Sequence, residues 1–560
     1  MHQLPSLTRR ELLKLGGAGL ALGATAGLVT AGPADAQSPK RGGRFRLRSH
    51  VPPVHFDPHL TLAFSTMIPL SFAYSRLVKV KAGSAVGPGT QPVEGDLAES
   101  WGRQGDTVYV FKLRRGVRWH NKAPLNGREL TAEDVRYSYD RFLTIKGNPN
   151  KSILEMVDKV EAPDKYTVKF TLREPNAWFL DRLASTSTWV VAKECVDQFG
   201  DLKKPESVVG TGPWMLRSYE PSVRITFDRN PSYFLPNLPY VDGVDITIST
   251  DPAAAFAQFL SGEFDFGPEY GMVIRRSDLD IALRRVKGLG MKDYIVVFGG
   301  YTAMKLDQEP FKDVRVRRAF AMAQDWRETL ETNAWSQGKG APNALIPAAL
   351  KEWAIPIDQL PPEGRKLYEF DPAAAKRLLA EAGHPNGLKV PIETTPGYGP
   401  DWMDAVQVAL RNWKQAGIEG ELKLKEYGAF VSSAIFGKFE KMIVTLRGGT
   451  TDPDTYFTPL LPGEPLNSSG VNDPKLTEMI KVQRRTFDEK KRRDIVYDIQ
   501  RYASQQVYYG FGASVSAVGA WMPYVKNFDP TSATTTAAAS WSPGSTSNRG
   551  PLRTMRSHNI

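Results

Sequence analysis

The sequence predicts an α/β fold built of more than one lobe. Three strand-like runs alternate apolar and polar residues, as half-buried strands do: DTVYVFKL, KYTVKFTL and VRITFDR. Other apolar runs follow aspartate–proline pairs, which are typical of helix starts. The chain has 560 residues, and a single hydrophobic core rarely serves more than about 250–300 residues. Two or three lobes are therefore expected.

The helix starts can be placed by their capping residues. Aspartate–proline pairs begin at Asp251, Asp371 and Asp473. In each pair the aspartate can accept hydrogen bonds from free backbone N–H groups, while the proline takes the first helical position. Gly262 and Gly383 follow two of these runs and suit C-terminal caps. Thr131 and Asp134 form an approximate capping box, which predicts a further helix over EDVRYSYDRFL.

The first 36 residues have the features of an export signal. Arg9 and Arg10 lie in a run, TRRELLK, that resembles a twin-arginine signal. A Gly/Ala-rich apolar stretch follows, and residues 34–36 read A-D-A, which predicts cleavage after residue 36. The alternative, an N-terminal membrane anchor, is disfavoured because the stretch is weakly apolar. No cysteine follows the small-residue end, so we expect an exported periplasmic protein without a lipid anchor.

Charge and cysteine content exclude several classes of function. The formal net charge is +11, but the basic clusters RGGRFRLR, RVRR and KKRR are short and interleaved with acids. Such clusters suit solvated helix faces or a modest preference for anionic ligands, so no nucleic-acid partner is expected. Cys195 is the only cysteine, which rules out an intramolecular disulfide. Its half-apolar surroundings, VVAKECVDQFG, predict a buried structural residue.

Signatures of catalysis are missing from the sequence. We find no G-x-x-x-x-G-K-[ST], H-E-x-x-H or G-x-S-x-G motif. His50, His55 and His59 lie in a proline-containing stretch, where a shared metal would need a specially shaped loop. Asp452 and Asp454 could do acid–base work, but beside a proline they more often build turns and caps. We expect a binding protein with no metal and no cofactor.

An ordered series of motifs resembles one family. GGRFRL, FDPHL and LAESW are followed by YVFKLRRGVRWHNKAPLNGRELTAEDVRYSYDR, VGTGPWMLRSYEPSVRITFDRNPSYF, VDGVDITISTDPAAAFAQFLSGEFDF, PFKDVRVRRAFAMAQD and DPAAAKRLLAEAGHPNG. Together these blocks resemble the extracellular solute-binding proteins of family 5, the peptide/nickel-type receptors of ABC importers. The resemblance covers roughly residues 40–530.

The resemblance implies a two-lobed periplasmic-binding-protein fold (type II, cluster C) with an extra subdomain in lobe one. The chain would cross between lobes near YIVVFGGYT (294–302) and QVYYGFGAS (506–514), although each could also be an ordinary core strand. The implied ranges are 1–36 for the signal, 37–82, 207–303 and 512–535 for lobe one, 83–206 for the inserted subdomain, 304–511 for lobe two and 536–560 for a flexible tail.

The resemblance also implies a function. The protein would capture an oligopeptide or peptide-like solute between closing lobes and deliver it, as a monomer, to a membrane permease with its cytoplasmic ATPase. One alternative is a non-peptide solute on the same fold: an acidic conjugate, an oligosaccharide or a metal chelate. The other is an exported hydrolase.

The stretch TLRGGTTDPD carries the sharpest departure from the family pattern. Peptide-binding members typically have W-x-x-D before the D-P element, and the aspartate pairs with the ligand's α-ammonium group. Here Leu446 takes the tryptophan's place, Gly449 takes that of the aspartate, and Arg447 lies between them. A buried ammonium group without a counter-charge is costly, whereas a guanidinium group suits carboxylate or phosphate. Arg447 could instead point to solvent or pair with Asp452 or Asp454.

The expected ligand-binding residues follow from this segment and from the crossing strands. Glycines let the backbone approach a solute, and aromatic rings give apolar area with a polar tip; for the aromatic residues, core packing is the alternative. The candidates are Phe64, Tyr301, Tyr427, Leu446, Arg447, Gly448, Gly449, Thr450 and Tyr508.

Overall fold

The computed structural model describes residues 40–81, 92–268, 272–297, 299–447, 452–526, 528 and 546–547. The signal expected at 1–36 lies outside the described residues, as does most of the tail. Within the described ranges, no helix has both the length and the apolar character needed to cross a bilayer.

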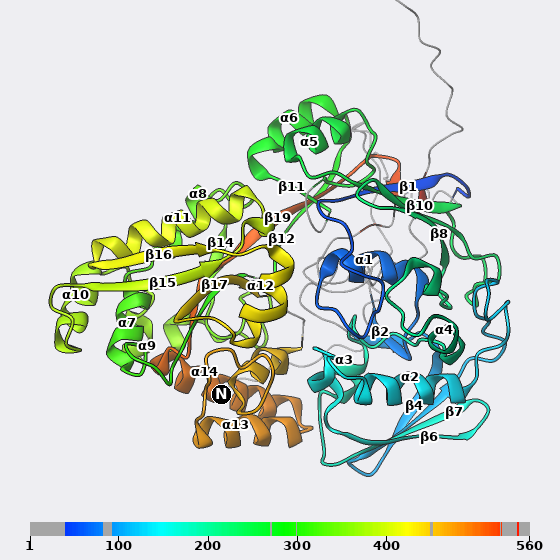
Figure 1. The fold of residues 1–560 in the computed structure, drawn as a ribbon, viewed down its shortest axis with the longest axis horizontal. Helices are drawn as coiled ribbons and strands as arrows, with labels where there is room; N and C mark the ends of the chain where they lie inside the picture. Colours follow the sequence, from blue (N-terminus) through cyan, green and yellow to red (C-terminus); the bar gives the residue numbers. More distant parts are fainter. Residues whose placement is uncertain are drawn as a thin grey trace, which may run out of the picture. The chain divides into compact units, whose positions relative to one another are not determined.

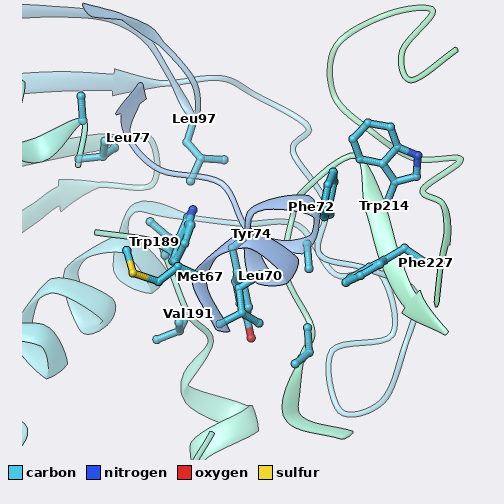
Figure 2. Close-up of a cluster of buried hydrophobic side chains, with 14 of the residues drawn as sticks. Met67, Leu70, Phe72, Tyr74, Leu77, Leu97, Trp189, Val191, Trp214 and Phe227 are labelled. Carbon is cyan, nitrogen blue, oxygen red and sulfur yellow. The ribbon is translucent and has the colours of Figure 1, made fainter. Parts of the chain in front are cut away.

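The first sheet pairs the start of the described chain with strands much later in sequence (Figure 1). Its order is β1-β10-β9-β8, with β1 parallel to β10 and the other pairs antiparallel. The strands are β1 (Arg44–Ser49), β8 (Trp214–Glu220), β9 (Arg224–Arg229) and β10 (Gly243–Ile248). Helix α1 (Phe64–Ala73) packs against β8. Figure 2 shows this core, where the Phe72 ring lies 5.6 Å from the Trp214 and Phe227 rings.

A second sheet is entirely antiparallel, in the order β4-β5-β7-β6. It contains β4 (Ala98–Gln104), β5 (Val108–Leu113), β6 (Val157–Asp164) and β7 (Thr167–Leu172). Helix α2 (Ala132–Thr144) packs on β6 and β7. Nearby elements are the β2–β3 pair (Val78–Val80, Val93–Gly95), α3 (Phe179–Leu183) and α4 (Lys193–Phe199). Both sheets contribute side chains to one continuous hydrophobic core.

A third sheet, in the order β16-β15-β17-β13-β18, organises the later half of the chain. β15 is parallel to β16 and β17, whereas β13 is antiparallel to β17 and β18. Its strands are β13 (Gly299–Met304), β15 (Leu388–Thr394), β16 (Ile418–Leu424), β17 (Met442–Arg447) and β18 (Tyr509–Phe511). The helices of this region are α7 (Val314–Met322), α8 (Trp326–Thr332), α9 (Pro362–Lys366), α10 (Pro372–Glu381), α11 (Pro400–Gln415), α12 (Tyr427–Ser433), α13 (Pro474–Arg485) and α14 (Glu489–Gln506).

A fourth sheet lies where the chain passes between these regions. β19 pairs with β11, β12 and β14, all antiparallel. β12 of the fourth sheet ends at Ile295 and β13 of the third sheet begins at Gly299, and Gly512 alone separates β18 from β19. The remaining elements are β11 (Val273–Ile274), β12 (Gly290–Ile295), β14 (Gly340–Pro342), β19 (Ala513–Trp521), β20 (Val525–Lys526), β21 (Thr546–Ser547), α5 (Pro252–Leu260) and α6 (Leu279–Arg285).

The local predictions from capping chemistry are confirmed. Helices α5, α10 and α13 begin at the prolines of the three aspartate–proline pairs, and each aspartate accepts a backbone N–H of its helix. Thr131 and Asp134 form the capping box of α2. Gly262 and Gly383 have φ of 77° and 95°, a left-handed conformation that suits glycine after a helix. Cys195 is buried, and burial raises the pKa of its thiol to about 12.

Candidate functional site

A cavity of about 700 Å³ lies among the described elements. Its walls come from the end of β1, the start of α1, residues 149–153 and 181–187, and the start of β13. The opposite side adds the loop before α11, α12, the end of β17 and residues 452–459. Both the first-sheet region and the third-sheet region therefore contribute side chains. A cavity of this size is typical of a site for a small solute.

Glycines allow the crossing segments to form part of the wall. The Gly512 N–H donates to the Gly300 carbonyl oxygen at 3.1 Å. A Cβ added at Gly512 would lie 3.2 Å from that oxygen, and one at Gly300 would lie 3.4 Å from the Trp402 ring. Side chains at these positions would therefore crowd the place where β13, β18 and the α11 helix meet. The glycines of the predicted crossing strands serve this close approach.

One wall of the cavity is aromatic. The Tyr398 ring meets Trp402 and Tyr427 edge-on, with ring centroids 5.6 and 5.7 Å apart. The Trp402 Nε1–H donates to Thr394 Oγ1 at 3.1 Å, and Tyr398 Oη shares a hydrogen bond with Thr445 Oγ1 at 3.3 Å. These hydrogen bonds fix the rings, so the wall presents preorganised apolar surface.

The charged groups of the wall are largely neutralised or paired. Asp401 accepts from Arg275 at 2.9 Å and from Trp335 Nε1 at 3.0 Å. Desolvation, helped by the charge of Arg48, lowers the pKa of His50 to about 4, so this ring is neutral at pH 7. Burial and the neighbouring Asp454 raise the pKa of Asp452 to about 8. Burial also raises the pKa of the cavity residue Asp181, to about 6.

The predicted site residues fall into three groups. Phe64, Tyr301, Tyr427 and Leu446 line the cavity. Tyr508 does not: it lines a smaller cavity of about 140 Å³, and its hydroxyl donates to Asp473 Oδ2. The Arg447 side chain and residues 448–450 lie outside what the structure describes, although the Arg447 backbone pairs with Gly299, a residue of the cavity wall.

Sequence reasoning found Tyr427 but missed the rest of the aromatic wall and its charged neighbours. The missed cavity residues include Arg182, Arg275, Trp335, Tyr398, Asp401 and Trp402. One signal was present: the run PGYGPDW (396–402) combines glycines, prolines and aromatic residues, as loops that approach ligands do. The arginines carried no comparable signal, because their partners lie far away in sequence.

The carboxylates and histidines singled out from the sequence have structural partners. Asp452 Oδ1 accepts the Asp454 N–H at 2.8 Å and caps the 3₁₀ turn η7 (Pro453–Tyr456), as the turn-building interpretation predicts. His55 Nε2 lies 3.2 Å from the Leu60 carbonyl oxygen, and His59 Nε2 lies 3.0 Å from that of Trp189. Among the described residues, no three His, Cys, Asp or Glu side chains are grouped to hold a metal ion.

Comparison with known proteins supports the family resemblance seen in the sequence. Residues 92–468 match the family described as bacterial extracellular solute-binding proteins, family 5 Middle. The chain is 27% identical over 460 residues to Di/tripeptide-binding protein 3 of Pseudomonas aeruginosa strain UCBPP-PA14. The aligned region covers 78% of this chain and 82% of that protein.

Solved structures share the fold. DppA, the ABC transporter-associated periplasmic binding protein of Helicobacter pylori in complex with the peptide STSA, matches with a TM-score of 0.76 and 22% identity. AgaA from A. tumefaciens R10, in complex with agropinic acid, gives the same two values. Each comparison covers 89% of this chain and 97% of the other. These matches confirm the predicted two-lobed α/β periplasmic-binding-protein fold.

Proposed function

Because this chain belongs to the bacterial extracellular solute-binding proteins of family 5, we propose that it is the substrate-binding receptor of an ABC importer. It captures an oligopeptide or peptide-like solute between its lobes and delivers the solute to a membrane permease with its cytoplasmic ATPase. The observation that carries this proposal is the cavity of about 700 Å³, whose walls come from both the first-sheet and the third-sheet regions. A solute that touches both sides stabilises the closed form by its differential contacts.

The sheet arrangement supports two lobes with a return of the chain to the first, although β13 (Gly299–Met304) of the third sheet begins before the expected boundary at 303/304. We place lobe one at 37–82, 207–303 and 512–535, its subdomain at 83–206 and lobe two at 304–511. The first two sheets share one hydrophobic core, and separate clusters cover the third sheet. The chain passes from the fourth sheet to the third between Ile295 and Gly299, and back between Phe511 and Ala513. These two short passages are the places where the chain can bend between lobes.

A non-peptide, acidic solute is the second candidate. Four arginines line the cavity: Arg48, Arg76, Arg182 and Arg275. The wall acids are Asp181, Asp401 and Asp452, of which Asp401 is paired with Arg275 and Asp452 is largely protonated at pH 7. Gly449 also stands where peptide-binding members carry an aspartate. Arg182 and Arg275 are paired with Asp454 and Asp401, and Asp181, whose pKa is about 6, is ionised at pH 7, so the wall carries charges of both signs. The acidic candidate therefore rests on the missing aspartate at position 449, and AgaA offers a precedent with agropinic acid.

The protein acts in the periplasm as a monomer, after export through the twin-arginine route and cleavage after residue 36. Arg9, Arg10 and the A-D-A end motivate this part of the proposal. Lysine at both arginine positions should leave the precursor in the cytoplasm. If cell fractionation shows normal export of that double variant, the protein does not use the twin-arginine route.

Mass spectrometry of the solute released from purified protein distinguishes the candidates. A peptide supports the first proposal, and an acidic non-peptide compound supports the second. No catalytic turnover is part of either, so the released solute should remain unchanged when it is incubated with fresh protein. Conversion of the solute would instead point to an exported hydrolase.

A further inference from the structure

Three aspartates of the described chain line the cavity, and they differ in how far the protein already uses their carboxyl groups. They are Asp181, Asp401 and Asp452. Asp401 forms an ion pair with Arg275 at 2.9 Å and accepts from Trp335 Nε1 at 3.0 Å. A cationic group of a solute would therefore have to compete with Arg275 for this carboxylate.

Asp452 is also engaged by the protein. Its Oδ1 accepts the Asp454 N–H at 2.8 Å and its Oδ2 accepts from Thr455 Oγ1 at 3.3 Å, so both oxygens serve the turn η7. Burial raises the pKa of Asp452 to about 8, and most of this group carries a proton at pH 7. A protonated carboxyl group offers no counter-charge to a cation.

Asp181 has no such commitment. It lies on α3, in the proposed subdomain (83–206), and its side chain is only partly buried. Among the residues that the structure describes, its carboxylate forms no ion pair and accepts no hydrogen bond from another residue. The cavity wall thus contains one aspartate whose oxygens remain available to a solute.

The arginines near Asp181 are directed to other acceptors. Arg182 and Arg492 act on Asp181 through their charge alone. Arg182 donates to Asp454, and Arg492 Nη1 donates to the Thr486 carbonyl oxygen at 2.8 Å. Neither guanidinium group therefore occupies the place of a direct partner.

The charge of Asp181 is only partly compensated. Burial raises the pKa of Asp181 to about 6, because the two arginines do not offset the loss of hydration. The group is still mostly ionised at pH 7. A buried charge without a direct partner is costly, so a cationic group of the solute would gain by meeting this carboxylate.

Asp181 also lies near the segment that lacks the aspartate of the family pattern. Gly449 stands at the position of that aspartate in the sequence, three positions before Asp452. Arg182, the neighbour of Asp181 on α3, approaches Asp452 at 3.8 Å. The α3 helix therefore brings a carboxylate to the edge of the cavity that the 452–459 segment forms from the opposite side.

We propose that Asp181 determines specificity by binding a cationic group of the solute, such as the α-ammonium group of a peptide, in place of the carboxylate missing at position 449. This anchor rests on the proposed function, because it acts only on a solute in the cavity. It favours an amine-bearing solute over a purely anionic one, and it assigns the amine to the α3 side of the cavity.

Calorimetry with three tripeptide probes tests the anchor. Tri-alanine amide carries only the ammonium group, N-acetyl-tri-alanine carries only the carboxylate, and tri-alanine carries both. The wild type should bind the two amine probes at least about tenfold more tightly than the acetylated probe. Asp181→Asn should bind the amine probes at least about tenfold more weakly and the acetylated probe no more weakly than the wild type. Asp181→Glu, which keeps the charge, should retain the preference for amines.

Asp158 offers a matched control. It lies on β6 of the same proposed subdomain, outside the cavity wall, and 59% of its side chain is exposed. Asp158→Asn changes the net charge by the same amount as Asp181→Asn. It should bind all three probes as the wild type does, and circular dichroism shows that each variant is folded.

Three results would overturn the anchor while leaving peptide binding in place. They are equal binding of the amine and acetylated probes by the wild type, unchanged binding of tri-alanine amide by Asp181→Asn, and an equal loss in Asp158→Asn. If the wild type binds none of the three probes, the proposed peptide function fails and the anchor fails with it.

Discussion

His59 and His120 are buried, and each uses both ring nitrogens. Nε2 of His59 lies 3.0 Å from the Trp189 carbonyl oxygen and its Nδ1 faces Arg141 Nη1 at 2.9 Å. In His120, Nε2 lies 3.0 Å from the Gly212 carbonyl oxygen and Nδ1 accepts the Gly210 N–H at 3.1 Å. A proton on either Nδ1 would face another N–H donor, so both rings are held neutral.

These histidines predict an acid-sensitive stability. Burial lowers the pKa of both rings to about 4, against an ordinary value of 6.5. Between these values the unfolded chain binds more protons, so the free energy of unfolding should fall as pH drops from about 6.5 to 4. Each ring contributes up to about 3 kcal/mol to this loss of unfolding free energy. Urea unfolding at pH 7 and pH 4.5 measures this loss, and His120→Gln, which can donate and accept as the neutral ring does, should reduce it. A loss of the same size in the variant contradicts the assignment.

We propose that Arg447 influences which class of ligand binds. It follows the cavity residue Leu446 and pairs through its backbone with Gly299. If Arg447 binds an acidic or carbonyl group of the solute, Arg447→Ala should weaken binding by about 2–5 kcal/mol, roughly thirtyfold or more. Gly449→Asp should oppose an anionic solute and favour an amine end. Calorimetry with the recovered solute measures both changes.

The control for these variants is Arg217→Ala, since Arg217 is an exposed arginine of β8 outside the cavity wall. If Arg447→Ala binds the solute with wild-type affinity, Arg447 is only a cation on the surface and does not contact the solute. Tight binding of simple peptides through a free amino end by the wild type would show that another acid supplies the anchor.

At the scale of elements, two aspartate caps should differ in their contributions to stability. Among the described residues, Asp251 Oδ1 accepts only from Ala253 and Ala254 of its own helix, at 2.7 and 2.9 Å. Asp473 caps α13 through Leu476 and also accepts the hydroxyls of Tyr502 and Tyr508 through Oδ2.

Asp251→Ala should therefore cost about 1 kcal/mol, the usual value of a helix cap. Asp473→Ala should cost about 2–4 kcal/mol, because it also leaves tyrosine hydroxyls without their acceptor. Urea midpoints at unchanged m-value give the two numbers. The matched asparagine variants, which retain a capping oxygen, should lose less stability. Equal losses in the two alanine variants would show that the tyrosine contacts do not contribute to stability.

Elements could be predicted where their determinants are local. The Asp–Pro starts of α5, α10 and α13 need only neighbouring residues, and the strand patterns of β5, β7 and β9 need only alternation. Tyr508 illustrates the limit. Tyr508 lies in the crossing segment 506–514, which led us to expect it in the cavity wall. Its hydroxyl instead donates to Asp473, 35 positions earlier in the sequence. The neighbouring residue Tyr509 lines the larger cavity.

At the scale of the molecule, the ordered motifs predicted the family and the fold, while the buried pairing of Arg182 with Asp454 could not be foreseen. Arg182 and Asp454 are 272 positions apart, and nothing in either local sequence specifies the other. The sequence interpretation of Asp452 and Asp454 as turn-building residues explains the cap of η7. It does not reveal that the same aspartates hold two remote segments together, because that depends on the assembled fold.

We propose that a solute in the cavity of about 700 Å³ holds the two lobes closed without being changed. Small-angle X-ray scattering at fixed pH, with and without the solute recovered from the protein, tests it most directly. We expect a smaller radius of gyration once solute and protein are equimolar, with the solute intact by mass spectrometry afterwards. A radius that does not respond to the solute would show that the solute does not close the lobes, and a solute recovered in altered form would show that the protein is not only a receptor.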